Sequence, residues 1–216
     1  MIDVRMFTVG PVQENCFVVR EQDSSSALIV DPGDEAERLL KAVDDLGIET
    51  VEAILVTHTH FDHIGAVAPV ARATGAPVYC PELETQVLAN IMDYVPWPGF
   101  GPFESYAADE TVKGGERLEL AGLTLDVIFT PGHSPGHVSY ALKGENALFS
   151  GDVLFQGSVG RVDLPGGDWP TLLRSIESLC DALPGEATVY PGHMGITTLA
   201  RERATNPFLQ ELAAKQ

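Results

Sequence analysis

All six histidines of the chain lie in three short motifs, and each motif follows an apolar, strand-like run. The motifs occupy residues 57–63 (THTHFDH), 131–137 (PGHSPGH) and 191–193 (PGH), and a fourth motif at 149–152 (FSGD) adds a carboxylate. Imidazole nitrogens and carboxylate oxygens are ligands for Zn(II), Fe(II) or Mn(II). We therefore predict a metal centre. It is not a helical HExxH site, because His58 and His63 are five residues apart with no Glu between them.

The apolar runs are predicted to be strands that place these motifs at one edge of a sheet. Strands are expected at residues 3–7, 16–20, 27–30, 51–57, 123–129, 138–142, 147–149 and 187–190. Helices are expected at 34–46, at a short segment with Pro69 in its first turn, at 169–183 and at 198–214. Asp34 and Glu37 are expected to form a capping box on the first of them. Strands grouped in each half, with flanking helices, indicate an α/β fold of two packed sheets with helices outside.

The segment at residues 93–115 interrupts this pattern. Between residues 94 and 106 it contains five aromatic residues interleaved with three prolines. Two interpretations remain open at this point. The segment is either a loop that lines or covers a pocket, or a loop held against the body by its aromatic side chains.

The length and net charge of the chain indicate a single domain and argue against nucleic-acid or membrane partners. The 216 residues suit one domain spanning 1–216, and 31 acidic against 13 basic residues give a net charge of −18. Such a charge repels phosphate backbones and anionic lipids, so neither nucleic acid nor a membrane is expected as a partner. We find no secretory signal and no apolar run near the ~18 residues of a membrane span. Cys16, Cys80 and Cys180 form no CxxC pair, which favours reduced thiols and a cytoplasmic location.

The spacing His58-x-His60-x-Asp62-His63, followed by His133, Asp152 and His193, resembles the metallo-β-lactamase fold superfamily over nearly the whole chain. The resemblance implies an αββα four-layer sandwich of two mixed sheets with outer helices. It also implies two metal ions, one held by His58, His60 and His133 and the other by Asp62, His63 and His193, with Asp152 bridging. His137 matches no ligand position, and we expect it to make a supporting hydrogen bond or to have a structural role.

Two divalent ions, with zinc favoured and iron or manganese alternatives, would supply hydrolytic chemistry. Such ions typically lie about 3.5–4 Å apart and lower the pKa of bound water from 15.7 to roughly 7, so a bridging hydroxide exists at neutral pH. They also stabilise the oxyanion of a tetrahedral intermediate. Asp62 and Asp152 are the predicted catalytic carboxylates, with Asp62 placed to orient the hydroxide. The sequence shows no dedicated general acid, which favours a thioester, because a thiolate with a pKa of about 8.5 leaves without prior protonation.

Within the superfamily, the chain most resembles the small bacterial glyoxalase II-like hydrolases. The resemblance lies in residues 150–155 (SGDVLF), 157–163 (GSVGRVD) and 197–208 (TTLARERATNPF). It implies hydrolysis of hydroxyacylglutathione, in which S-lactoylglutathione and water give lactate and glutathione. The 216 residues show no counterpart of the C-terminal helical domain of larger glyoxalase II enzymes, and we expect none. It also has Asp163 where those enzymes tend to have an aromatic residue, and Met194 in place of a glycine. The native thiol is therefore left open.

Other members of the superfamily have different activities, and particular residues and motifs of the chain bear on them. Asp152 argues against the main zinc β-lactamases, which carry Cys or another residue there. The alternative is a persulfide dioxygenase, which residues 160–163 (GRVD) also resemble and which uses a single iron at positions matching His58, His133 and Asp152. A lactonase or other esterase ranks lower, as does a metal-binding interaction protein without activity.

Three arginines are predicted to bind a small-molecule substrate: Arg161, Arg201 and Arg203. They stand out because the chain has only 13 basic residues. The competing interpretation for each is an ion pair with one of the 31 acidic residues.

Overall fold

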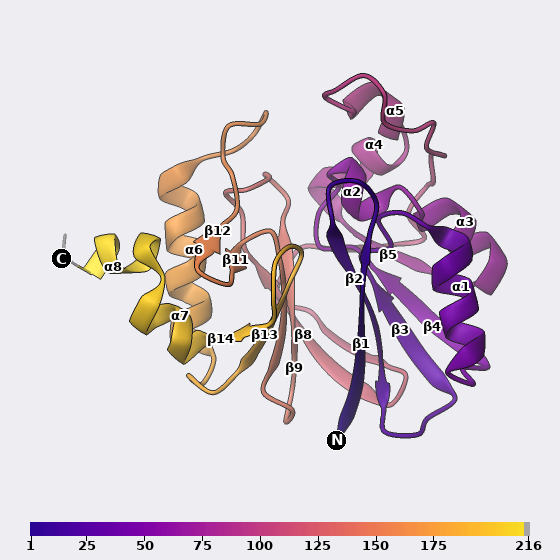
Figure 1. Ribbon diagram of the computed structural model, residues 1–216, viewed down its shortest axis with the longest axis horizontal. Coiled ribbons are helices and arrows are strands. Elements are labelled where there is room, and N and C mark those ends of the chain that lie inside the picture. Colours follow the sequence, from indigo (N-terminus) through magenta and orange to yellow (C-terminus); the bar gives the residue numbers. More distant parts are fainter. Residues whose placement is uncertain (214–216) are drawn as a thin grey trace.

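The computed structural model describes residues 1–213 and shows four layers, with helices on the outer face of each of two central sheets (Figure 1). The first six-stranded sheet has the order β1-β2-β3-β4-β5-β6, and the second has the order β14-β13-β10-β9-β8-β7. Both sheets contain parallel and antiparallel pairs. The predicted α/β four-layer sandwich of two mixed sheets is therefore confirmed.

The first sheet and its helices come from the first half of the chain. Its strands are β1 (Ile2–Val9), β2 (Glu14–Glu21), β3 (Ser26–Val30), β4 (Thr50–Leu55), β5 (Val78–Pro81) and β6 (Glu110–Val112). The helices are α1 (Ala36–Asp45), α2 (Phe61–Ile64), α3 (Val67–Thr74), η1 (Glu82–Glu84), α4 (Thr85–Leu88) and α5 (Ile91–Tyr94). Strands β1 to β3 pair antiparallel, and β3 to β6 pair parallel.

The second half builds the other sheet and outer layer. Its strands are β7 (Arg117–Leu120), β8 (Leu123–Phe129), β9 (Val138–Leu142), β10 (Ala147–Gly151), β13 (Thr188–Pro191) and β14 (Thr197–Thr198). A two-stranded ribbon pairs β11 (Leu154–Phe155) with β12 (Ser158–Val159). The helices are α6 (Trp169–Ala182), α7 (Leu199–Thr205) and α8 (Pro207–Ala213), and none of the helices within residues 1–213 combines the length and apolarity needed to cross a membrane.

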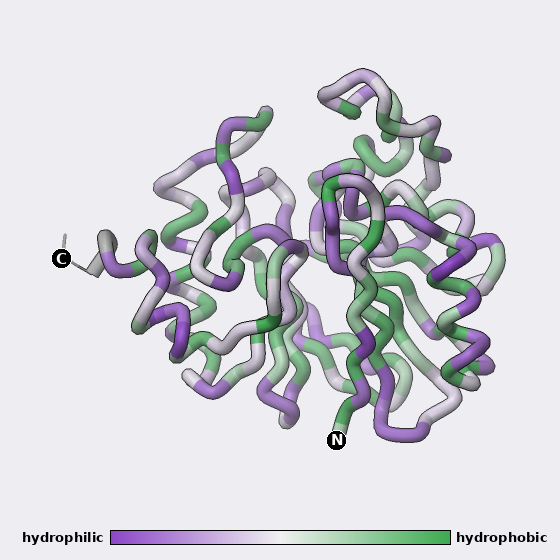
Figure 2. The backbone as a smooth tube through the Cα atoms, in the orientation of Figure 1, coloured by the Kyte–Doolittle hydropathy of each residue, from purple (hydrophilic) through white to green (hydrophobic). Residues whose placement is uncertain are grey.

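Alternating side chains of the strands build separate apolar layers. In β3, Ala27 and Ile29 pack with the cluster under α1 and α3, whereas Leu28 and Val30 face the cluster between the sheets. A third cluster joins the second sheet to α6. The hydrophobic colouring along the central strands in Figure 2 follows this arrangement. Period-2 alternation with both faces apolar is what a sheet covered on both sides requires.

Strand direction brings the four motifs to one edge. Strands β8 and β10 both run antiparallel to β9, so they are parallel to each other, and β13 is parallel to β10. The segments that follow β8, β10 and β13 therefore leave the second sheet at the same edge. The two sheets are joined close to this edge, where the amide of Val138 donates to the carbonyl of Thr57 at 2.9 Å.

Three local predictions were wrong. Helix α1 begins at Ala36 after Glu35, which has a left-handed φ of 53°, and no side chain caps it, so the Asp34–Glu37 capping box does not form. The helix predicted at 198–214 is broken between α7 and α8, because Asn206 precedes Pro207 and is extended. Residue 214 itself lies outside the described residues. The interrupted segment at 93–115 contains β6.

Candidate metal centre

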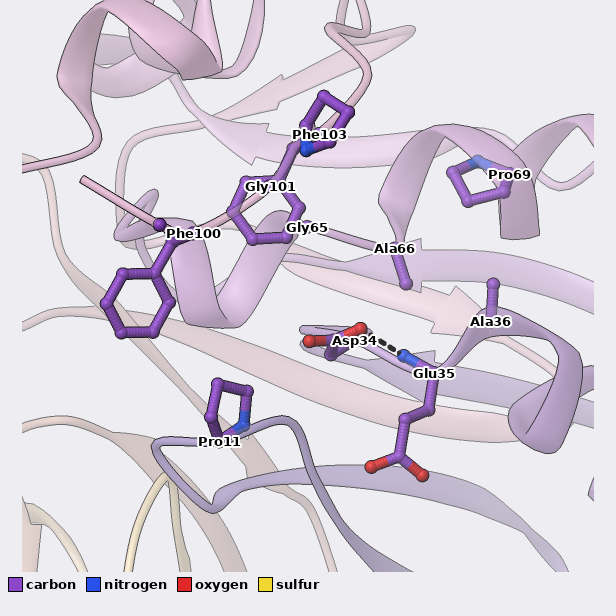
Figure 3. Close-up of a pocket in the computed structure, with 12 residues that line it drawn as sticks. Pro11, Asp34, Glu35, Ala36, Gly65, Ala66, Pro69, Phe100, Gly101 and Phe103 are labelled. Carbon is purple, nitrogen blue, oxygen red and sulfur yellow. Dashed lines mark hydrogen bonds between the residues drawn. The ribbon is translucent and has the colours of Figure 1, made fainter. Parts of the chain in front are cut away.

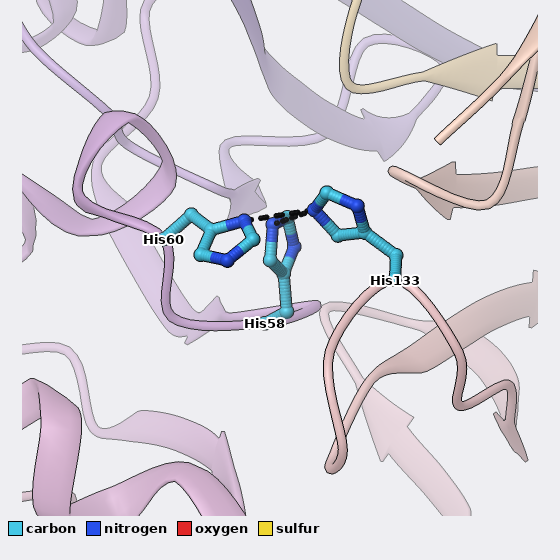
Figure 4. Close-up of side chains that lie close together, drawn as sticks. All are labelled: His58, His60 and His133. Carbon is cyan, nitrogen blue, oxygen red and sulfur yellow. Dashed lines mark hydrogen bonds between the residues drawn. The ribbon is translucent and has the colours of Figure 1, made fainter. Parts of the chain in front are cut away.

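His58, His60 and His133 form the first ligand group, and their rings point toward one another (Figure 4). Nε2 of His133 lies 3.2 Å from Nε2 of His58 and 2.8 Å from Nδ1 of His60. Nitrogens that share one zinc ion at about 2.0–2.1 Å in a tetrahedral site lie about 3.3 Å apart. These three nitrogens therefore have the spacing of ligands to one ion.

Asp62, His63 and His193 form a second group, whose ligand atoms lie within 4.8 Å of one another. Oδ2 of Asp62 is 3.3 Å from Nε2 of His193 and 4.0 Å from Nε2 of His63. His63 is fully buried, whereas Asp62 and His193 are partly exposed. The second group is therefore open to solvent on one side, as a site that admits a substrate must be.

Asp152 lies between the two groups. Its Oδ2 is 3.5 Å from Nε2 of His133 in the first group and 3.5 Å from Nε2 of His193 in the second. Its Oδ1 is 3.3 Å from Nε2 of His63, yet both of these buried atoms lack a hydrogen-bond partner. An unpaired buried polar atom is costly, and a divalent cation would satisfy both atoms. The residues therefore fit two divalent metal ions.

The protonation of the two groups differs. Burial lowers the pKa of His58 well below its usual value and lowers that of His60 to about 4, so both rings are neutral with a free lone pair. Burial alone would raise the pKa of Asp152, but charged His63 and His193 hold it far below its usual value. For His63, burial opposes and the charge of Asp152 favours the imidazolium, and the net effect is a raised pKa.

Three of the histidines, His63, His133 and His193, are held through Nδ1, whereas their Nε2 atoms face Asp152. Nδ1 of His63 faces Oδ2 of Asp31 at 3.0 Å, and Asp31 also accepts bonds from the amide and hydroxyl of Thr57 at 2.7 and 2.6 Å. Nδ1 of His133 donates to the carbonyl of Arg161 at 2.8 Å. Nδ1 of His193 donates to the carbonyl of Gln13 at 3.2 Å. Such bonds set the tautomer, so that Nε2 remains for the metal.

Asp31 was not predicted, although the sequence contained a signal for it. It directly follows a strand-like run, β3, in the same way as the ligand motifs follow theirs. Glu14 was also missed, and no comparable pattern marks it. Both oxygens of its fully buried carboxyl lack a hydrogen-bond partner, Oε1 lies 3.7 Å from Nδ1 of His63, and burial raises its pKa well above the usual value. Glu14 is therefore a buried carboxyl beside the second group, and burial favours its neutral form.

His137 supports Asp152 and does not bind the metal ions through a free nitrogen. Its Nδ1 pairs with Oγ1 of Thr130 at 2.9 Å, and its Nε2 accepts a bond from the amide of Asp152 at 3.1 Å. Both ring nitrogens are thus engaged, and burial lowers the pKa of the ring, which keeps it neutral. This agrees with the supporting hydrogen bond expected from the sequence.

The 191–194 segment approaches the centre closely. A Cβ at Gly192 would lie 2.3 Å from Oδ1 of Asp152 and 2.6 Å from Cε1 of His63, so only glycine fits there. Nδ2 of Asn15 donates to the carbonyls of Pro191 and Met194 at 3.0 and 2.9 Å and so holds the segment in place. The side chain of Met194 itself is exposed.

The 93–115 segment both packs against the body of the protein and lines a pocket, so the two interpretations of this loop are compatible. The Phe61 ring, adjacent in sequence to Asp62, lies 4.8 Å from the Phe100 ring and 6.2 Å from the Trp97 ring, measured between centroids. A pocket of about 380 Å³ is lined by residues 99–103 together with Pro11, residues 34–36, 65, 66 and 69 (Figure 3). No predicted metal ligand lines this pocket, so the pocket does not contain the centre.

The three predicted substrate-binding arginines lie in two places. Nε and Nη2 of Arg161 each donate to the carboxylate of Asp163 at 2.7 Å, and its guanidinium carbon lies 5.5 Å from the centre of the Trp97 ring. Arg201 and Arg203 lie on α7 in the outer helical layer (Figure 1). Arg203 donates to the carbonyl of Cys180 in α6. The substrate-binding role of all three stays a prediction.

Comparisons with known proteins agree with this geometry. Two relatives are the probable metallo-hydrolase YqgX of Bacillus subtilis, 40% identical over 95% of this chain and 96% of that one, and the hydroxyacylglutathione hydrolase GloC of Haemophilus influenzae, 32% identical over 96% and 98%. Two similar solved structures are the BLEG-1 B3 metallo-β-lactamase (TM-score 0.90, 40% identity, 96% and 99% covered) and TTHA1623 in a di-iron-bound form (TM-score 0.84, 40% identity, 95% and 100% covered).

The family model of the metallo-β-lactamase superfamily matches residues 9–193, a range that contains all seven predicted metal ligands. The match also covers both sheets from the end of β1 to β13. The chain belongs to the metallo-β-lactamase superfamily.

Proposed function

We propose that the protein is a binuclear metallo-hydrolase that cleaves a small thioester, with hydroxyacylglutathione as the first candidate substrate. The observation that carries the proposal is the position of Asp152, whose carboxylate contacts histidines of both ligand groups. Zinc is the proposed metal, and iron is the alternative because the structure of TTHA1623 is a di-iron form.

In this proposal the two ions activate the water, and Asp62 orients it. When bound, the two ions would supply Lewis acidity and a water of lowered pKa. Asp62 is partly exposed, and its proposed role is to accept a hydrogen bond from the attacking water. Burial would raise the pKa of Asp62, but the bond from His193 and the charge of His63 lower it, so the group remains an acceptor at neutral pH.

Arg161 is the proposed anchor for the anionic part of the substrate. Its carbonyl is bonded to the ligand His133, and its side chain is 49% exposed beside Trp97. Two of its donor nitrogens contact Asp163, which leaves Nη1 without a protein partner among the described residues. The guanidinium is thus held in place by Asp163 and Trp97 while one donor edge stays available.

The chemistry of the leaving group favours a thioester. The imidazoles described at the centre either belong to the two ligand groups or, in the case of His137, bond through both nitrogens. None is therefore positioned as a free acid, and a thiolate does not need one because its conjugate acid has a pKa of about 8.5. The resemblance to GloC, named as a hydroxyacylglutathione hydrolase, supports the same substrate class.

The proposal includes a cytoplasmic location and a small-molecule substrate. Cys16, Cys80 and Cys180 are free thiols in the structure, which supports a reducing, cytoplasmic location. The net charge of −18 supports a small-molecule substrate over nucleic acid.

The test is hydrolysis of S-lactoylglutathione by protein whose metal content has been measured, with and without a chelator. We expect chelator-sensitive turnover with about two ions per chain, restored by added zinc. Full loading with two ions and no turnover of any thioester in a panel would contradict the proposed substrate class while leaving the centre intact.

Two further assays separate competing activities. Oxygen consumption with glutathione persulfide by iron-loaded protein would support the dioxygenase alternative, and anaerobic activity with zinc would exclude it. A lactone and a chromogenic β-lactam complete the panel, since the BLEG-1 structure matches this chain at a TM-score of 0.90. A β-lactam turned over faster than the thioesters would overturn the thioester proposal.

A further inference from the structure

We propose that Glu84 is a positioning residue that holds the first metal group together by joining the 57–63 segment to the 131–137 segment. The inference rests on the metal centre proposed above and adds a residue that binds no metal. Glu84 ends η1, beyond β5 of the first sheet, whereas His133 belongs to the segment between β8 and β9 of the second. The first metal group draws ligands from both sheets, so something must keep the two segments in register.

The Glu84 carboxylate is buried and accepts four hydrogen bonds. Oε2 accepts from the amide and hydroxyl of Thr59, at 2.6 and 2.8 Å, and Thr59 lies between the ligands His58 and His60. Oε1 accepts from the amide of Gly136 at 2.8 Å and from the hydroxyl of Ser134, the residue after His133. Each carboxylate oxygen thus serves one of the two segments.

Close packing makes this bridge rigid. A Cβ at Gly136 would lie 2.5 Å from Cγ of Glu84, so the backbone of the 131–137 segment rests directly on the glutamate side chain. Carboxylates that accept several backbone amides are strong, directional anchors. Loss of a group that hydrogen-bonds a metal ligand directly typically costs about 10–100-fold in metal affinity, and Glu84 acts on residues adjacent to or near such ligands.

Asp31 and Glu84 hold different parts of the centre, so loss of Glu84 should affect the two metal groups unequally. Asp31 bonds to Thr57 and to His63, a ligand of the second group. Glu84 contacts neither His63 nor the 191–193 segment in any hydrogen bond of the described residues. Of the two segments that it joins, 57–63 carries candidate ligands of both groups, whereas 131–137 carries only His133 of the first group. Loss of Glu84 should therefore weaken the first metal group more than the second.

Glu84→Gln tests the bridge without changing its size. An amide has one acceptor oxygen and one donor nitrogen, and in either orientation its NH₂ faces a backbone amide donor, at Thr59 or at Gly136. One of the two segments must then detach. Glu82→Gln is the matched control, because Glu82 is two residues away, exposed, and paired with Lys113 at 2.9 Å.

Each metal group is measured alone by zinc titration against a chromogenic chelator. His193→Ala retains the first group, and His60→Ala retains the second. In the His193→Ala background we expect Glu84→Gln to raise the zinc dissociation constant about 10–100-fold. In the His60→Ala background we expect a change below about threefold, and Glu82→Gln should leave both constants unchanged.

Equal losses in the two backgrounds, or no loss in either, would overturn the assignment of Glu84. If Glu84→Gln does not fold, Ser134→Ala removes only one of the four bonds and should still raise the first constant, by about twofold or more. An unchanged constant in that variant would equally overturn it. Failure of the proposed function is distinguishable, because the wild-type chain would then bind no zinc or bind it without hydrolysing the substrate panel.

Discussion

Nε2 of His63 and Oδ1 of Asp152 lie 3.3 Å apart in the buried part of the centre, and neither atom has a hydrogen-bond partner among the described residues. Their other polar atoms are engaged: Nδ1 of His63 faces Asp31, and Oδ2 of Asp152 faces His133 and His193. A divalent cation bound between these two buried atoms would satisfy both of them. The relationship makes the metal content of the protein the first quantity to measure.

Asp152→Asn should remove metal and activity together. The amide keeps the size of the side chain but places a neutral group where His63, His133 and His193 face a carboxylate. We expect fewer than two ions per chain and a loss of hydrolysis larger than the about 10–100-fold cost of losing an outer partner. Asp126→Asn, which changes an exposed carboxylate paired with Arg117, is the control and should behave as wild type. Wild-type metal content and rate in Asp152→Asn would refute the bridging role.

Acidification should release the two ions in order. Protons compete with metal for a ligand as the pH falls toward that ligand's pKa. Burial lowers the pKa of His60 to about 4, so protons displace metal from the first group only at low pH. For His193, burial lowers the pKa, but the charges of Asp152 and Asp62 raise it by more, so the net pKa is raised. Protons therefore begin to compete with metal for His193 at a higher pH than for His60.

The ion held by Asp62, His63 and His193 should therefore be lost first. The measurement is metal content per chain after equilibration at stepped pH values from 8 to about 4. An intermediate with one ion is the expected result. Simultaneous loss of both ions, or retention of one ion in His60→Ala but not in His193→Ala at the intermediate pH, would contradict the order.

Arg161→Ala should raise KM more than it lowers kcat. A hydrogen bond to a charged group is worth about 1.5–3 kcal/mol, which corresponds to a rise in KM of about tenfold or more. Arg117→Ala is the matched control, since Arg117 is similarly exposed and also pairs with an aspartate at 2.7 Å. Equal KM values in Arg161→Ala and wild type would assign Arg161 a purely structural ion pair with Asp163.

Only one of the three thiols should react with a thiol reagent in the folded protein. Cys16 and Cys80 are buried, and burial raises the pKa of both thiols well above the usual range, so the reactive thiolate is scarce. Cys180 is partly exposed. We expect one fast equivalent in native protein, three after unfolding, and none in native Cys180→Ser. A native Cys180→Ser protein that still reacts quickly would show that the core opens.

The candidate ligands could be predicted from the sequence because a metal centre restricts residue type as well as spacing. Histidine and aspartate at the ends of apolar runs are informative one residue at a time, so His58, His133, Asp152 and His193 could be found without knowing any contact. The strands could be predicted for a related reason: buried apolar residues alternate with less buried ones along 123–129, and 138–142 is buried throughout. Short elements such as β6 and β14 carry too few residues for a pattern and were missed.

What the tertiary structure decided is which residues serve those ligands. Glu84 and Glu14 are ordinary acidic residues among 31, and nothing in their sequence neighbours says that they are buried. Asp31 follows a strand-like run, but the run alone does not show that its carboxylate holds His63. Glu84 becomes a bridge only because strand order brings residues 59 and 136 to the same carboxylate. The sequence by itself determined the superfamily, the layers and the metal-binding residue types. Only packing across the two sheets decided which further carboxylates hold the candidate ligands in place, since that choice depends on contacts between residues far apart in the sequence, such as Glu84 with Ser134 and Gly136.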